Sequence, residues 1–136
     1  MRARRATYST GILRRPPKTK FALIDVVNLH AALIDVVNLH AAGSRLVTVE
    51  VFDWSNGSPV PLRVSPCGSR SCTVRVRAGQ SVFLYADVSK VRFKYEVRLT
   101  LRADRKLIAN VFGVTNAPFT PQEGDTVLQR NLVRIR

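Results

Sequence analysis

The chain has 136 residues, 46% of them apolar, and it carries 22 Lys and Arg residues against 9 Asp and Glu. This length allows one domain with a single core, and the apolar content excludes a disordered chain. No apolar run approaches the ~18–20 residues of a membrane-spanning helix, and the basic N-terminus is not followed by the apolar segment of a secretory signal peptide. The formal charge of +13 predicts affinity for anionic partners and carries no information about the fold.

Residues 1–20 are expected to form a basic arm and connector ahead of a β-sandwich domain that spans residues 21–136. The arm contains seven Lys or Arg residues and no acidic residue. Pro16–Pro17 can continue neither a helix nor a central strand. Between the basic clusters, residues 6–13 alternate as a strand does, and this segment could pair with an open sheet edge. A frayed, solvated terminus is the alternative interpretation.

A perfect repeat follows the arm. The ten residues ALIDVVNLHA occupy positions 22–31 and recur unchanged at positions 32–41. Because ten is an even number, the second copy keeps each side chain on the same face of a strand. We therefore expect one copy to be a core strand and the other a tolerated extension, so that deleting residues 32–41 leaves a folded protein. The repeat creates His30 and His40, but no ligand cluster of recognisable spacing surrounds them, and no metal site is predicted.

Alternation of apolar and polar residues predicts strands along the rest of the chain. The clearest is residues 91–102, whose apolar side chains are expected on the core face: Val91, Phe93, Tyr95, Val97, Leu99 and Leu101. Residues 81–88 are apolar on both faces and are expected to be buried on both. Other strands are predicted at 45–54, 72–77, 106–115 and 125–135, with an edge strand or loop at 59–66. The sum is about eight strands, which predicts an all-β, antiparallel, jelly-roll-like β-sandwich with an extended N-terminal arm.

Three side chains in the turns invite a specific interpretation. Cys67 and Cys72 bracket a four-residue turn, and a local disulfide there would stabilise the domain by about 2 kcal/mol. Intermolecular bridging and two free thiols are the alternatives. Trp54, the single tryptophan, ends a predicted strand and is expected to cover the core, because of the area that its ring buries.

No enzyme motif is present. The chain lacks a GxSxG sequence, a glycine-rich phosphate loop and a recognisable pair of carboxylates. We therefore predict no catalytic residue and no cofactor. The outward positions of the predicted strands carry basic residues that could neutralise phosphates, although no aromatic residues alternate with them as a stacking platform for bases. These residues are Arg75, Arg77, Arg92, Lys94, Arg98 and Arg102.

Three segments resemble small β-sandwich proteins of spore-forming bacteria that are associated with the spore surface and its appendage fibres. The segments are YSTGILRRPPKTKF at 8–21, VTVEVFDWSNGSPVPL at 47–62 and NVFGVTNAPFTPQEGDTVLQRNLV at 110–133. The resemblance implies jelly-roll subunits that polymerise when the N-terminal segment of one subunit engages the sheets of another. Some members of these families add intermolecular disulfides from cysteines in the arm, but residues 1–20 contain no cysteine.

Three hypotheses of function follow. The first is a structural subunit of an extracellular spore-surface fibre, a helical homopolymer that donates residues 6–13 to a neighbouring copy, with anionic spore-surface components as further partners. Its interface residues would be Tyr8, Thr10, Gly11 and Ile12, with Tyr8 and Ile12 inserted and Gly11 allowing close backbone approach. The second is a viral-coat-like jelly roll whose Arg-rich arm binds nucleic acid. The third is a binding module for anionic polymers or carbohydrates.

Overall fold

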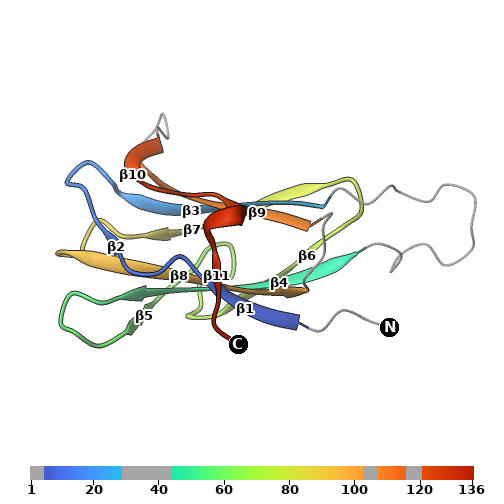
Figure 1. Ribbon diagram of the computed structural model, residues 1–136, viewed down its shortest axis with the longest axis horizontal. Helices are drawn as coiled ribbons and strands as arrows, with labels where there is room; N and C mark the ends of the chain where they lie inside the picture. Colours follow the sequence, from blue (N-terminus) through green and yellow to red (C-terminus); the bar gives the residue numbers. More distant parts are fainter. Residues whose placement is uncertain (1–4, 29–43, 103–106, 116–120) are drawn as a thin grey trace, which may run out of the picture.

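The chain folds into two antiparallel sheets that pack face to face (Figure 1). The computed structural model describes residues 5–28, 44–102, 107–115 and 121–136. The all-β, antiparallel β-sandwich predicted from the sequence is confirmed. Within the described ranges, eight strands have five residues or more, which agrees with the predicted number, and no helix is long and apolar enough to cross a membrane.

The larger sheet, sheet A, has the strand order β11-β1-β8-β4-β5, with β2 also paired to β8 and β6 also paired to β4. Its strands are β1 (Arg5–Ser9), β2 (Leu13–Arg14), β4 (Arg45–Asp53), β5 (Val60–Leu62), β6 (Cys72–Val76), β8 (Lys94–Arg102) and β11 (Val133–Arg134). Sheet B has the order β10-β9-β3-β7. Its strands are β3 (Phe21–Asn28), β7 (Ser81–Asp87), β9 (Leu107–Val114) and β10 (Pro121–Val127), and a 3-10 turn, Gln129–Asn131, leads from β10 to β11.

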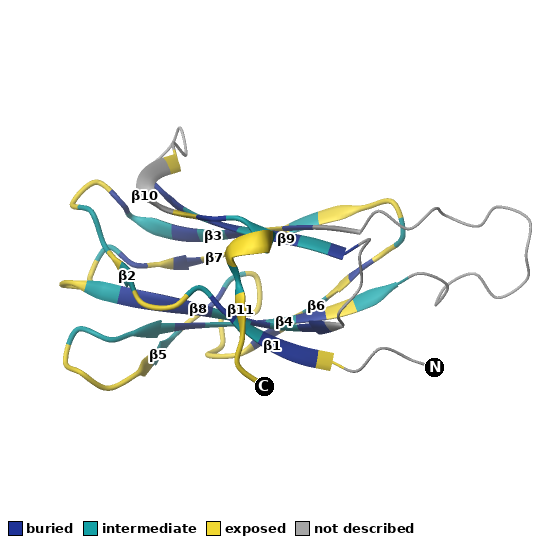
Figure 2. Cartoon of the chain, viewed as in Figure 1, coloured by how far each residue is buried: buried dark blue, intermediate teal, exposed yellow. Residues whose placement is uncertain are grey.

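The core lies between the two sheets, and buried residues alternate with less buried ones along the long strands (Figure 2). The alternation predicted for β4 and β8 is present, because valines and leucines at every second position are fully buried while the residues between them, except Glu96, are more exposed. The buried members are Val47, Val49 and Val51 on β4, Tyr95, Val97, Leu99 and Leu101 on β8, and Ile24, Val26, Leu84, Ala109 and Val111 on sheet B. Each strand therefore supplies one apolar face to a shared core.

Two predicted side-chain orientations are wrong. Phe93 was expected on the core face, but β8 begins only at Lys94, so Phe93 lies in the preceding turn and is 54% exposed. Residues 81–88 were expected to be buried on both faces, yet Phe83 is 62% and Tyr85 39% exposed. The reason is that β7 packs the core with one face only, through Leu84 and Ala86, whereas Phe83 and Tyr85 lie on its opposite face.

The first copy of the repeat begins in β3, so this copy supplies a core strand as predicted. The second copy, together with His30 and His40, lies outside the described residues. The N-terminal segment also takes a place in the body of the domain. Instead of extending away as an arm, β1 and β2 both pair with β8 of the same chain. This long-range pairing was not expected, because residues 1–20 were predicted to form an arm and connector ahead of the domain.

Candidate subunit interface

Strand β1 lies between β8 and β11 and is hydrogen-bonded on both edges (Figure 1). It pairs with β8 over its whole length. On the other side, the Thr7 N–H donates to the carbonyl of Arg136 at 3.1 Å, and the Thr7 carbonyl accepts from the N–H of Ile135 at 2.8 Å. Tyr8 is paired with Arg134 in the same ladder. The N-terminal segment thus fills a slot between two strands.

The inner face of β1 completes the core of sheet A. Ala6 lies opposite Leu101 and Tyr8 opposite Leu99, and Ala6 is only 2% exposed. Tyr8 packs partly buried against the core cluster. Ile12, which the sequence paired with Tyr8 as an inserted side chain, is 50% exposed and lies beyond the end of the strand. The apolar contacts of the segment therefore come from Ala6, Tyr8 and Leu13.

The chain continues along β8 after a local turn at Gly11. Thr10 donates its N–H to the carbonyl of Val97 at 3.0 Å, and its hydroxyl accepts from the Val97 N–H at 3.1 Å. Leu13 then pairs with Tyr95. Gly11 has a φ of +71°, and an added Cβ would meet no atom within 4 Å. A glycine suits this position because of its left-handed backbone, and no close approach of another chain segment requires it.

A buried carboxylate fastens the end of β1 to the outer face of sheet A. Glu96 is only 5% exposed and accepts three side-chain hydrogen bonds. Two groups donate to Oε2: the hydroxyl of Ser9, and Arg98 Nε at a distance of 3.0 Å. The indole N–H of Trp54 donates to Oε1 at 2.9 Å. Arg98 also lies over the ring of Phe52 at 4.7 Å. Trp54 therefore belongs to this cluster on the outer face of sheet A, and the prediction that its ring covers the core is wrong.

The surroundings of Glu96 keep its carboxyl group ionised. Burial raises the pKa of Glu96, but the hydrogen bonds from Arg98, Ser9 and Trp54 outweigh that effect and hold the pKa below its ordinary value of 4.5. At neutral pH all three bonds are therefore charge-assisted, which makes them roughly twice as strong as neutral ones. Because one donor belongs to β1, the ionised carboxylate binds the N-terminal strand to β8 and to the end of β4. The sequence offered no signal for this role, since Glu96 occupies an outward position of the alternation.

Two further polar contacts hold the outer face of β1. The hydroxyl oxygens of Thr7 and Thr100 are 2.9 Å apart. Arg5 donates from one guanidinium nitrogen to the hydroxyl of Thr48 at 3.2 Å and to the carbonyl of Thr100 at 3.1 Å. Together with the Ser9–Glu96 hydrogen bond, these contacts hold the outer face of β1 from Arg5 to Ser9.

Residues 15–20 connect this segment to β3 in the other sheet. Arg15 donates its N–H to the carbonyl of Phe93 and its Nε to the carbonyl of Thr19, both at 2.8 Å. Lys20 bonds through its N–H to the carbonyl of Val114 at 2.8 Å. Pro16–Pro17 occupies the crossing between sheets, where the missing N–H groups cost no ladder bond. The crossing is the covalent link between the β1–β2 segment and the rest of the domain.

The other residues singled out in the sequence lie elsewhere. Cys67 and Cys72 form a disulfide with Cα atoms 5.4 Å apart, closing the connection between β5 and β6. Cys72 is fully buried at the start of β6. In the described part of the chain, no group of three or more His, Cys, Asp or Glu side chains could hold a metal ion.

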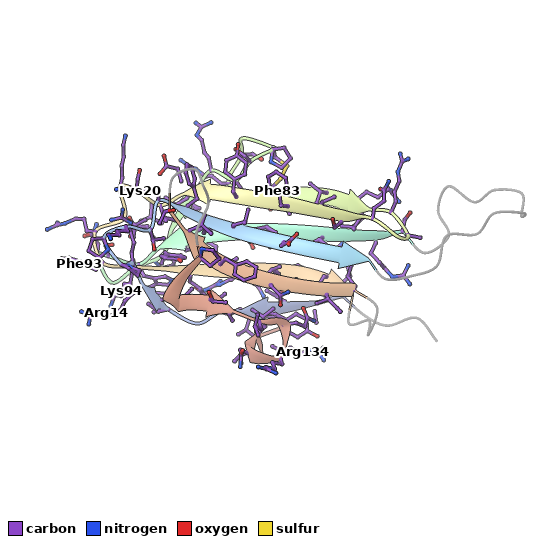
Figure 3. The ribbon with its side chains drawn as sticks, turned by 90° about the horizontal axis from the view of Figure 1, so that it is seen from above. Arg14, Lys20, Phe83, Phe93, Lys94 and Arg134 are labelled. Atoms are coloured by element: carbon purple, nitrogen blue, oxygen red, sulfur yellow. A yellow bond between two sulfur atoms is a disulfide. The ribbon has the colours of Figure 1, made fainter. Side chains whose placement is uncertain are left out.

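The basic residues are spread along the length of sheet A. Arg75 is paired with Leu46 near the start of β4, whereas Tyr95, next to Lys94, is paired with Asp53 at its end. Seven residues of extended chain separate these positions, or roughly 23 Å. At the second end, Arg14 lies directly opposite Lys94 in the β2–β8 ladder (Figure 3).

No protein-family model matches the chain, and comparison with curated proteins finds no significant match.

Proposed function

We propose that this protein is a structural subunit that polymerises by exchanging its N-terminal strand with a neighbouring copy. The observation that carries the proposal is the slot between β8 and β11, which β1 fills with hydrogen bonds on both edges. Every contact that β1 makes in its own domain is available to the same segment of a second copy. Head-to-tail exchange of this kind is heterologous, so it forms an open filament unless the rotation happens to close a ring. No catalytic role is part of the proposal.

The energetics of exchange depend on the connector. Since the contacts in the slot are the same in one chain or between two, exchange is opposed mainly by the effective concentration of the chain's own strand, which is roughly millimolar for a short linker. Short hinge segments favour exchange because the closed form strains them. Residues 15–20 contain Pro16–Pro17, whose fixed φ favours an extended connector. With residues 15–20 extended, β1 would lie away from its own domain, where it can reach a neighbouring copy.

We propose further that the polymer is an extracellular fibre of the spore surface, with anionic surface components as additional partners. The support is the resemblance of residues 8–21, 47–62 and 110–133 to proteins of that setting, and the net charge of +13. Covalent crosslinks between subunits through arm cysteines are not part of this proposal, because both cysteines of the chain are joined to each other.

A disulfide placed across β1 and β8 tests strand exchange. Thr7 directs both of its main-chain groups toward β11, so Thr7 and Thr100 form a non-hydrogen-bonded pair, for which Cα atoms lie about 4.5 Å apart. The double variant Thr7→Cys/Thr100→Cys therefore meets the geometry of a disulfide. If assembled protein has exchanged strands, oxidation yields a ladder of covalent multimers on a non-reducing gel. If each strand stays in its own domain, oxidation yields monomers.

The control is Thr48→Cys/Thr73→Cys. These two residues face each other across β4 and β6 with hydroxyl oxygens 2.7 Å apart, and both belong to the body of the domain, so oxidation must give monomers in either case. Filaments or oligomers that yield only monomers from the Thr7/Thr100 pair would refute strand exchange. Failure of the wild-type protein to assemble at any concentration would refute the proposed function as a whole.

The nucleic-acid coat protein is the second candidate, because Arg14 and Lys94 lie side by side at one end of the sandwich, the end at which Lys20 also lies (Figure 3). Binding through such phosphate contacts releases nearly one counterion for each phosphate contacted. The association constant should therefore fall steeply as the salt concentration rises. Closed shells that retain nucleic acid would favour this candidate. Filaments free of nucleic acid that persist at high salt would favour the first.

A further inference from the structure

The outer face of sheet B is apolar and exposed, in contrast to the polar outer face of sheet A. A hollow of about 550 Å³ lies on it, lined by Phe21, Leu23 and Asp25 of β3, Phe83 and Tyr85 of β7, and Val114 of β9. Among the described residues, Phe83 is the most exposed large apolar side chain, at 62%. An exposed apolar surface with such aromatic side chains is typical of a protein-binding site.

The hollow is largely preformed and carries one charge. The rings of Phe21 and Tyr85 meet edge to face with centroids 5.9 Å apart, and those of Phe83 and Tyr85 stack at 6.3 Å. Asp25 is exposed and lies opposite Phe83 in the β3–β7 ladder. It is the only Asp, Glu, Lys or Arg among the lining residues. Aromatic faces and a carboxylate both attract a cation, so this hollow suits a partner that combines an apolar ring with a positive charge.

The chain displays such a combination at one end of the sandwich. Phe93 is 54% exposed, and the guanidinium carbon of Arg92 lies 5.2 Å from the centroid of its ring. The backbone of Phe93 is held on both sides, because its N–H donates to the Ser55 hydroxyl at 3.1 Å and its carbonyl accepts from the Arg15 N–H at 2.8 Å. An aromatic ring with an adjacent arginine on a fixed backbone can bind with little loss of conformational freedom, and both residue types are enriched in protein interfaces.

We propose that the Arg92–Phe93 pair of one copy docks in the aromatic hollow of a second copy, with the Phe93 ring against Phe83 and Tyr85 and the Arg92 guanidinium near Asp25. Charge complementarity selects this occupant: two copies of a protein with a net charge of +13 repel each other, so their contact is favoured where a cation meets a carboxylate. The two surfaces differ, so the contact is heterologous and extends from copy to copy.

The inference deepens the proposed function, and it rests on that function in taking a second copy as the partner. It does not use β1, however. The two contacts can therefore be separated with the Thr7→Cys/Thr100→Cys variant, oxidised while dilute and monomeric. In this locked protein β1 cannot leave its own domain, and any remaining association needs another surface.

The experiment measures self-association of the locked protein by sedimentation velocity. We expect concentration-dependent oligomers, and we expect Phe93→Ser and Asp25→Arg each to raise the dissociation constant at least tenfold. A mixture of these two variants should form 1:1 dimers that do not grow, because the Phe93→Ser copy retains an intact hollow and the Asp25→Arg copy an intact Arg92–Phe93 pair. Val60→Ser is the matched control for Phe93→Ser, since Val60 is 50% exposed on β5, outside both surfaces.

Three outcomes would overturn the inference: locked protein that stays monomeric, association that neither substitution weakens, or a mixture that forms no dimers. If the docking contact fails these tests, strand exchange is still supported when the Thr7→Cys/Thr100→Cys variant, oxidised after assembly, yields covalent multimers. Conversely, locked protein that associates through Phe93 and Asp25 supports the docking contact even where that assay yields monomers alone. A thermal melt of each variant confirms that these exposed substitutions leave the domain folded.

Discussion

Replacing Glu96 by glutamine removes the charge at the centre of the contacts that hold β1, while keeping the shape of the side chain. The carboxylate accepts from Ser9 and Arg98 through Oε2 and from Trp54 through Oε1. An amide has one acceptor oxygen, so Glu96→Gln cannot serve both positions. If its oxygen takes the place of Oε2, its NH₂ group faces the indole N–H of Trp54, and that bond is lost.

The expected destabilisation follows from counting these bonds. Leaving a buried group without its partner costs about 1–3 kcal/mol. Of the two bonds that remain, the one from the Ser9 hydroxyl becomes neutral and loses about half of its strength, while the one from Arg98 keeps a charged donor but loses its charged acceptor. We therefore expect Glu96→Gln to lower the free energy of unfolding by about 2–4 kcal/mol, out of roughly 5–15 kcal/mol for a domain. The corresponding fall in Tm is roughly 6–16 °C.

Urea unfolding of the monomeric protein, followed by tryptophan fluorescence, measures this difference. Trp54 is the only tryptophan and contacts Glu96 directly, so the probe reports on the same cluster. Glu50→Gln is the matched control: Glu50 lies opposite Arg98 on the same outer face of sheet A, and a surface change there should stay within about 0.5 kcal/mol. If Glu96→Gln costs no more than Glu50→Gln, the carboxylate does not hold the N-terminal strand and the reasoning is wrong.

Three further predictions concern the same domain. Because the pKa of Glu96 is held below 4.5 in the folded protein, its stabilising effect is complete above that pH and is lost as the pH falls through the folded value; the stability difference between wild type and Glu96→Gln should therefore shrink in acid, and a constant gap from pH 7 to 3 would contradict this. Gly11→Ala should cost about 1–2 kcal/mol, because a φ of +71° is unfavourable for any residue with a Cβ, and equal stability of Gly11→Ala and wild type in a thermal melt would count against the turn. The double variant Cys67→Ser/Cys72→Ser should lose about 2 kcal/mol in urea unfolding, the loop-closure value for so short a loop, and an unchanged midpoint would show that the bond does not stabilise the fold.

Local patterns in the sequence determined the strands and the fold class. In β4 and β8, valine, leucine and tyrosine at every second position predict one buried face, and the structure buries Val47, Val49, Val51, Val97 and Leu99 completely. This succeeds because side chains of a strand alternate between two faces whatever the strand pairs with. Asn56–Gly57 is a dipeptide typical of turns, and it lies in a turn in which Gly57 has a φ of +83°. Such features depend on neighbours in sequence.

The candidate interface was decided only by the tertiary structure, because its contacts join residues far apart in the chain. Ser9 and Glu96 are 87 residues apart, and no local pattern indicates that β8 and β11 flank the segment that contains Ser9. Alternation also cannot tell which outward face another element covers: Glu96 is buried on one sheet, whereas Phe83 is exposed on the other. Packing between the sheets and long-range strand pairing set these environments, since the burial of a side chain depends on what lies against it and not on its own type.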